Sequence, residues 1–119
     1  MKTFRDLFVW QKAHRLVLDV YLVTNTFPRS ELYGLTSQMR RSAVSVSANI
    51  VEGFQRRGRA DFARFLDIAA ASLEELQYYV LLGRDLDYFP SDKAKSIGER
   101  GNEVGRMLYA LWRKQKEVL

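Results

Sequence analysis

The strongest constraint on the fold is the helical spacing of apolar residues in the long segments around two prolines. Pro28 and Pro90 are the only prolines among 119 residues. Around them, apolar residues recur every three or four positions, as on one face of a helix, and nowhere alternate as in a strand. The most regular stripe comprises Phe62, Phe65, Leu66, Ala69, Leu73, Leu76, Val80 and Gly83. We therefore predict an all-α chain.

The apolar stripes predict four helices, at about residues 5–26, 31–55, 60–87 and 91–118. Thr3 with Asp6 three positions later resembles a capping box ahead of the first helix. Gly53 and Gly58 are expected to end the second helix. Short connections force neighbouring helices to be antiparallel, so we predict an up-down-up-down four-helix bundle. Residues 1–119 are expected to form a single domain, since this is an ordinary domain length.

A turn centred near Gly58 determines which residues of the second and third predicted helices face each other. Both helices rise by the same distance per residue, so this turn places Arg41 opposite Glu75. It also places Glu52 opposite Arg64. We predict both contacts, because one choice of turn brings two pairs of opposite charges into register.

Cysteine and histidine are too scarce for most catalytic or metal-binding sites. There is no cysteine, and His14 is the one histidine, so a thiolate nucleophile and a His-rich metal site are excluded. The Glu-x-x-His motif of di-iron bundles is absent, because Gln11 stands three residues before His14. We expect a non-enzymatic protein without a cofactor. We also expect a cytoplasmic location, since neither a secretion signal nor a membrane-spanning stretch is recognisable.

A polar stripe on the second predicted helix, with its predicted partner face on the third, admits three interpretations. It can be a buried hydrogen-bond network that fixes the helix register, a binding site for a polar ligand or nucleic-acid group, or a solvent-exposed face. The first is favoured, with Arg41 paired to Glu75. The residues are Gln38, Arg41, Ser45, Asn49, Glu52, Ser72 and Glu75.

The positive charge is expected at one end of the bundle, where both chain termini meet the turn between the second and third helices. Nine cations gather there: Lys2, Arg5, Arg56, Arg57, Arg59, Arg64, Arg113, Lys114 and Lys116. Three acids accompany them, Asp6, Asp61 and Glu117, which leaves a charge of +6 at this end. The whole chain has a net charge of +5, so the rest of it is close to neutral. Such an end can bind phosphates by releasing counterions, or can simply be solvated.

Several motifs in order along the chain resemble a known family. They are Phe4-x-x-Leu7-x-x-Trp10-x-x-Ala13, Phe27-Pro28-x-x-Glu31-x-x-Gly34-Leu35, Gln38-x-Arg40-Arg41, Asn49-Ile50-x-Glu52-Gly53 and Ala69-x-x-Ser72-x-x-Glu75-Leu76. They resemble the four-helix-bundle proteins of the 23S rRNA intervening-sequence family. The resemblance implies a homopentameric ring encoded within inserts of the large ribosomal RNA gene. Similar accessory proteins of diversity-generating retroelements are taken to bind nucleic acid and a reverse transcriptase.

Two functional hypotheses follow from the charge and the resemblance. The first is a nucleic-acid-binding accessory protein in which the basic ends of several copies share one rim of a ring. The alternative is a protein-interaction scaffold that recognises its partner through exposed aromatic side chains. Self-association is expected in either case, because the aromatic residues exceed what one narrow bundle seam requires. Those residues are Phe4, Phe8, Trp10, Tyr109 and Trp112.

Overall fold

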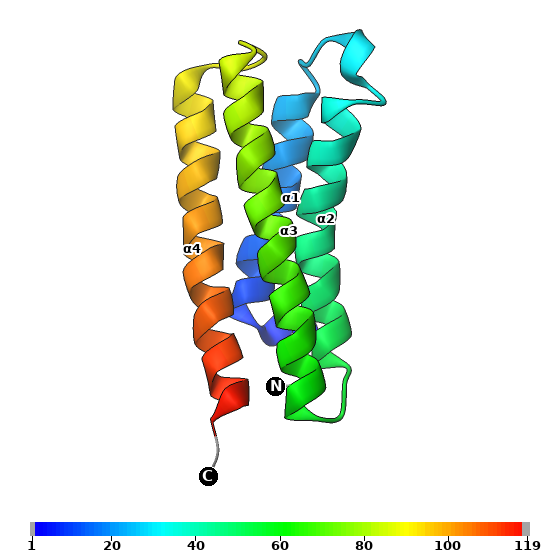
Figure 1. The fold of residues 1–119 in the computed structure, drawn as a ribbon, viewed down its shortest axis with the longest axis vertical. Coiled ribbons are helices and arrows are strands. Elements are labelled where there is room, and N and C mark those ends of the chain that lie inside the picture. Colours follow the sequence, from blue (N-terminus) through cyan, green and yellow to red (C-terminus); the bar gives the residue numbers. More distant parts are fainter. Residues whose placement is uncertain (1, 118–119) are drawn as a thin grey trace.

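The computed structural model describes residues 2–117, and these form an all-α structure of four helices and two short 3-10 helices (Figure 1). The elements are η1 (Phe4–Asp6), α1 (Phe8–Thr24), η2 (Arg29–Glu31), α2 (Leu35–Phe54), α3 (Arg59–Asp85) and α4 (Ser91–Lys116). Successive long helices run in opposite directions in Figure 1 and build a rod of 50 × 23 × 20 Å. The prediction of four helices and no strand is confirmed for the described residues.

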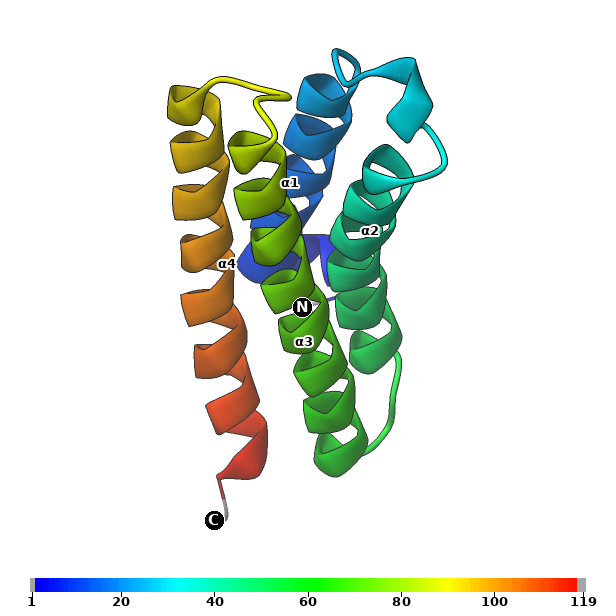
Figure 2. The same ribbon diagram turned by 45° about the horizontal axis from the view of Figure 1, so that its top comes forward.

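The core runs the length of the rod, and every long helix contributes to it. Figure 2, tilted from the first view, shows α1 lying behind α3. The predicted apolar stripes supply the buried side chains, because residues three and four apart share one helix face. The largest fully buried side chains are Leu16, Met39, Ile50, Leu66, Leu76 and Leu108. Among residues 2–117, no helix combines the length and the apolar character needed to cross a membrane.

The aromatic residues expected between subunits divide into two groups. Trp10 and Trp112 are half-buried and pack against the core. Phe4 is also half-buried, and its ring packs edge-on against Trp10, with the two ring centroids 4.9 Å apart. Phe8 and Tyr109 instead expose 72% and 60% of their surfaces. Of these five aromatic residues, only Phe8 and Tyr109 therefore leave large apolar area uncovered in a single copy.

The first predicted helix, 5–26, is interrupted at Leu7. The capping box forms as expected, but it caps η1: the Asp6 carboxylate accepts from the backbone N–H groups of Thr3 and Lys2, which lowers its pKa. Leu7 is extended, with φ −78° and ψ 120°, and it is buried. This extended residue separates η1 from α1, which then runs only to Thr24.

The second predicted helix, 31–55, starts four residues late because Gly34 leaves the helical conformation, with φ −113° and ψ −116°. As a glycine it has no side chain to cap α2, and Glu31 does so instead by accepting from the Leu35 N–H at 3.1 Å. Glu31 also accepts from the Tyr88 hydroxyl at 2.6 Å. Both bonds lower the pKa of Glu31, and the bond from Tyr88 has the larger effect. The bond between Tyr88 and Glu31 also raises the pKa of Tyr88.

The third helix ends two residues earlier than predicted, in a Schellman motif. The Tyr88 N–H donates to the Gly83 carbonyl and the Asp87 N–H to the Arg84 carbonyl, which is the pattern of that motif. Asp87 occupies the left-handed position, with φ 59°, where glycine is usual. The fourth helix begins at Ser91 as predicted and is described to Lys116; the predicted end at residue 118 lies outside the described residues.

The glycines of α4 include one that accommodates a side chain of α3. A Cβ on Gly101 would lie 2.2 Å from Gln77 Nε2, whereas one on Gly98 would meet nothing nearer than 3.9 Å. Gln77 Nε2 uses that space to donate to the Gly98 carbonyl at 3.1 Å and to Asn102 Oδ1 at 3.3 Å. Close approach at Gly101 therefore serves packing between α3 and α4 within one chain.

Candidate nucleic-acid interface

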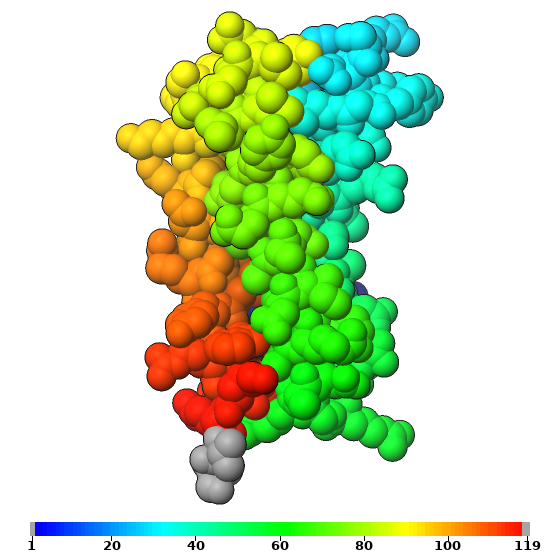
Figure 3. All heavy atoms as spheres, in the orientation of Figure 1, coloured from blue at the N-terminus to red at the C-terminus, as the bar shows by residue number. Residues whose placement is uncertain are grey.

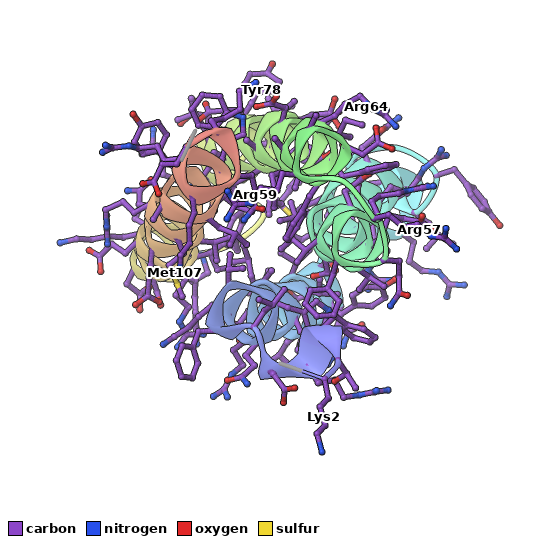
Figure 4. The ribbon with its side chains drawn as sticks, turned by 90° about the horizontal axis from the view of Figure 1, so that it is seen from below. Lys2, Arg57, Arg59, Arg64, Tyr78 and Met107 are labelled. Carbon is purple, nitrogen blue, oxygen red and sulfur yellow. The ribbon has the colours of Figure 1, made fainter. Side chains whose placement is uncertain are left out.

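The nine predicted cations belong to the end of the rod that holds the α2–α3 turn and both chain termini, which we call the basic end. Figure 4 shows this end from below. Arg57 and Arg64 project outward on the side of α2 and α3, Arg59 lies between the ends of α3 and α4, and Lys2 points away on the opposite side, beside α1. All nine predicted cations are exposed. The four cations labelled in Figure 4 are therefore spread across this end and do not form a single compact patch.

Two arginines of the basic end are held on one aromatic ring. The guanidinium carbons of Arg56 and Arg64 lie 4.6 and 4.5 Å from the centroid of the Phe65 ring. Arg56 also donates to Glu52 at 3.1 Å, and Arg64 lies 3.5 Å from Asp61. Stacking and exposed ion pairs of this kind restrict the side chains at little energetic gain, so both guanidinium groups stay available at the surface.

Other cations of this end have structural roles. Arg59 donates to the Glu117 carbonyl at 3.4 Å, Arg5 lies over Phe4, and Lys116 lies over Trp112. Lys116 also stands in the last turn of α4, where positive charge compensates the partial negative charge of the helix end.

Among residues 2–117, four side chains of the basic end form no ion pair, hydrogen bond or cation–π contact, and one of them is Lys2, which bonds Asp6 only through its backbone N–H. The other three are Arg57, Arg113 and Lys114. The charge predicted for this end needs one correction, because Glu52 reaches it through Arg56. Nine cations and four acids leave +5 instead of +6.

The polar stripe of α2 is only partly a network. Ser45 and Ser72 share a hydrogen bond of 2.8 Å between α2 and α3. Asn49 Nδ2 donates to the Ser45 carbonyl at 2.8 Å and to Ser45 Oγ at 3.1 Å. These three half-buried residues join the two helices. The Ser45–Ser72 pair differs by one residue from the predicted register, which places Ser45 opposite position 71. The structure brings together Ser45, Asn49 and Ser72, whereas Gln38, Arg41, Glu52 and Glu75 are exposed.

Neither predicted ion pair between α2 and α3 exists among the described residues. Glu52 pairs with Arg56, two residues beyond the end of α2, and Arg64 pairs with Asp61 on α3, because partners three or four positions away along the chain are within easy reach. Arg41 and Glu75 are both exposed and unpaired in that part of the chain. The interpretation of Arg41 as a buried charge paired to Glu75 is wrong.

One arginine was missed as a candidate site residue. Arg40 is half-buried, and its Nε donates to Thr24 Oγ1 at 2.8 Å while Nη2 donates to Asn25 Oδ1 at 3.2 Å. These acceptors lie 16 and 15 positions away, so no local pattern relates them to Arg40. The Gln-x-Arg-Arg motif was the only sequence signal that marked this position.

Comparison with known proteins agrees with the all-α structure. The profile of the family described as "23S rRNA-intervening sequence protein" matches residues 5–110. A crystal structure from Bacteroides thetaiotaomicron, of a protein with unknown function from the S23 ribosomal protein family, is similar with a TM-score of 0.79 and 25% identity. The match covers 88% of this chain and 98% of that one. No curated protein matches. The family match confirms the resemblance seen in the motifs: this chain belongs to the 23S rRNA-intervening sequence protein family.

Proposed function

We propose that this protein is a non-enzymatic nucleic-acid-binding protein that contacts the phosphate backbone of RNA or DNA through its basic end. The observation that carries the proposal is the charge of +5 at that end, from nine exposed cations and four acids. Arg57, Arg113 and Lys114 are exposed there without a partner among the described residues. Cations placed in this way bind polyanions by releasing condensed counterions.

The contacts are proposed to be with phosphates and not with bases. Phe65 is covered by Arg56 and Arg64, and Phe62 packs edge-on against Phe54. These rings are therefore not open platforms for stacking bases. Arginine suits the contact that remains, because its planar group bonds a phosphate through two N–H groups at once. Binding is expected to depend strongly on salt and weakly on sequence.

Several copies are proposed to act together in a ring, the homopentamer that the resemblance implies. Large apolar side chains exposed by a single copy support self-association: Phe8 at 72%, Leu22 at 69% and Tyr109 at 60%. Copies whose basic ends share one rim would multiply weak individual contacts. Native mass spectrometry tests this part, and a 13.9 kDa species alone would refute it.

The experiment compares two charge reversals of equal size at the two ends of the rod. Arg57→Glu with Lys114→Glu changes the basic end, while Lys93→Glu with Lys95→Glu changes the first turn of α4 at the opposite end. All four side chains are exposed. Binding of a labelled 20-nucleotide RNA and the matching DNA is followed by fluorescence anisotropy across a salt series.

We expect the basic-end variant to lose affinity. The slope of log K against log salt concentration should also become shallower, by about 0.7 to 0.9 for each phosphate contact that is lost. The opposite-end variant should retain both. Equal losses in the two variants would show that net charge alone matters, and absence of binding at about 50 mM salt would refute the proposal, since counterion release is strongest there.

A further inference from the structure

A groove on the side of the bundle, away from the basic end, lies between α1, α2 and the segment that joins them. Its volume is about 610 Å³. The joining segment, around residues 28–34, projects from the upper right of the molecule in Figure 3. Apolar walls come from Tyr21, Leu32, Tyr33 and Val44.

The first cation of the groove, Arg40, is held in a fixed orientation by neutral groups. Thr24 and Asn25 accept from its guanidinium at 2.8 and 3.2 Å, and the Tyr21 ring centroid lies 4.6 Å from its guanidinium carbon. Within residues 2–117 no carboxylate pairs with it. A half-buried charge is usually compensated by an anion, and here that anion is not supplied by the described part of the chain.

A second unopposed cation stands beside the first. Arg41 lines the same groove, and no acidic side chain does. Its predicted partner, Glu75, forms no ion pair with it, as described above. Two guanidinium groups therefore face a groove with apolar walls, and one of them is already ordered, which lowers the entropic cost of binding an anion.

We propose that this groove binds an acidic peptide segment of a protein partner, in which a carboxylate side chain lies next to an apolar one. The carboxylate contacts Arg40 and Arg41, and the apolar side chain packs against Leu32, Tyr33 and Val44. Tyr33 exposes 93% of its surface, so it is available for such a contact.

The composition of the groove favours a peptide over a nucleic acid. A nucleic-acid strand is bound by a series of cations that follows its backbone, as we propose for the basic end. The groove has two cations, and its exposed lining is mostly apolar. An apolar pocket with a few fixed polar groups is typical of sites that bind a side chain.

The test measures binding of a labelled pentapeptide, Glu-Phe-Glu-Leu-Glu, to the full chain by fluorescence anisotropy, beside its neutral analogue Gln-Phe-Gln-Leu-Gln. Arg41→Gln removes one cation without touching a described contact. Arg106→Gln is the matched control, since Arg106 is an exposed arginine on α4 outside this groove. Tyr33→Ala removes the most exposed apolar wall.

We expect saturable binding of the acidic peptide that weakens about tenfold in Arg41→Gln, the effect of losing one charged hydrogen bond. Tyr33→Ala should also weaken it, and Arg106→Gln should not. Equal binding of the neutral peptide, or no saturable binding, overturns the proposal. So does displacement of the peptide by a 20-nucleotide RNA whose own binding is lost in Arg41→Gln, which would assign the groove to nucleic acid. A changed native mass of the unliganded Arg41→Gln protein would instead assign the groove to a second copy.

Discussion

The replacement of Gly53 by alanine tests the close approach of α2 and α3 beside the basic end. A Cβ at this position would lie 2.8 Å from Phe62 Cδ1 and 3.0 Å from Phe65 Cβ. The second atom is next to the α3 backbone, so the helices themselves must move apart. Gly98 provides the matched control in α4, because a Cβ there meets nothing nearer than 3.9 Å.

The two substitutions share one favourable contribution and differ in one unfavourable contribution. Alanine is more stable than glycine inside a helix by about 1 kcal/mol. Forcing extra atoms into a packed contact costs about 1 to 3 kcal/mol. Gly53→Ala should therefore lower the free energy of unfolding by about 1 kcal/mol, while Gly98→Ala should raise it by about the same amount.

Equilibrium unfolding in urea measures the difference. With a slope of about 2 kcal/mol per molar urea, a gap of about 2 kcal/mol separates the two midpoints by about 1 M. Equal slopes would show that the comparison concerns stability alone. If the Gly53→Ala midpoint equals or exceeds that of the wild type, α2 and α3 do not meet at Gly53 as described, and the packing argument is refuted.

Two further predictions concern the opposite end of the rod. Tyr88→Phe removes the hydrogen bond to Glu31 and should lower the melting temperature at neutral pH. The hydrogen bond lowers the pKa of Glu31, so the stability it contributes is lost as the pH falls through the pKa of Glu31 in the folded protein. It raises the pKa of Tyr88, so this stability is also lost as the pH rises through the pKa of Tyr88 in the folded protein. The gap between wild type and variant should therefore narrow below pH 4.5 and above pH 10, the ordinary values of these groups; a constant gap would contradict this. Asp87→Gly should raise the melting temperature, by about 0.5 to 1 kcal/mol of stability, because glycine adopts the left-handed conformation at φ 59° without strain. A lower melting temperature would show that the Asp87 side chain itself stabilises the turn.

The helical core was predictable because burial follows residue spacing. Leu66, Leu76 and Leu108 are on faces that the three- and four-residue spacing identifies, and all three are fully buried. The helix ends were less predictable, since tertiary contacts decide them. Leu7 is extended and packs into the core between η1 and α1, and Leu32 is 49% exposed because α2 starts after Gly34 and not before it.

Side-chain partners at the surface were the least predictable part. Register alone placed Glu52 near Arg64, yet each pairs with a residue three or four positions away along the chain, because several partners of similar energy compete for an exposed charge. The gathering of cations at one end needs only the order of the helices and was accessible from the sequence. The groove around Arg40 depends on Thr24 and Asn25 of another helix end, so it became visible only in the folded chain.

The hydrogen bond between Tyr88 and Glu31 makes the two ends of the rod unequal in local opening. It ties the α3–α4 connection to the segment before α2, and Glu31 holds the first turn of α2 at the same time. At the other end, the α2–α3 turn contains Gly58, around which a Cβ would meet no atom within 4 Å. Backbone amides of that turn should exchange with solvent hydrogen sooner than those near Leu35, since fewer contacts must break. We therefore expect the proposed binding end to open first, so that a bound polyanion would be detected there as slowed amide exchange.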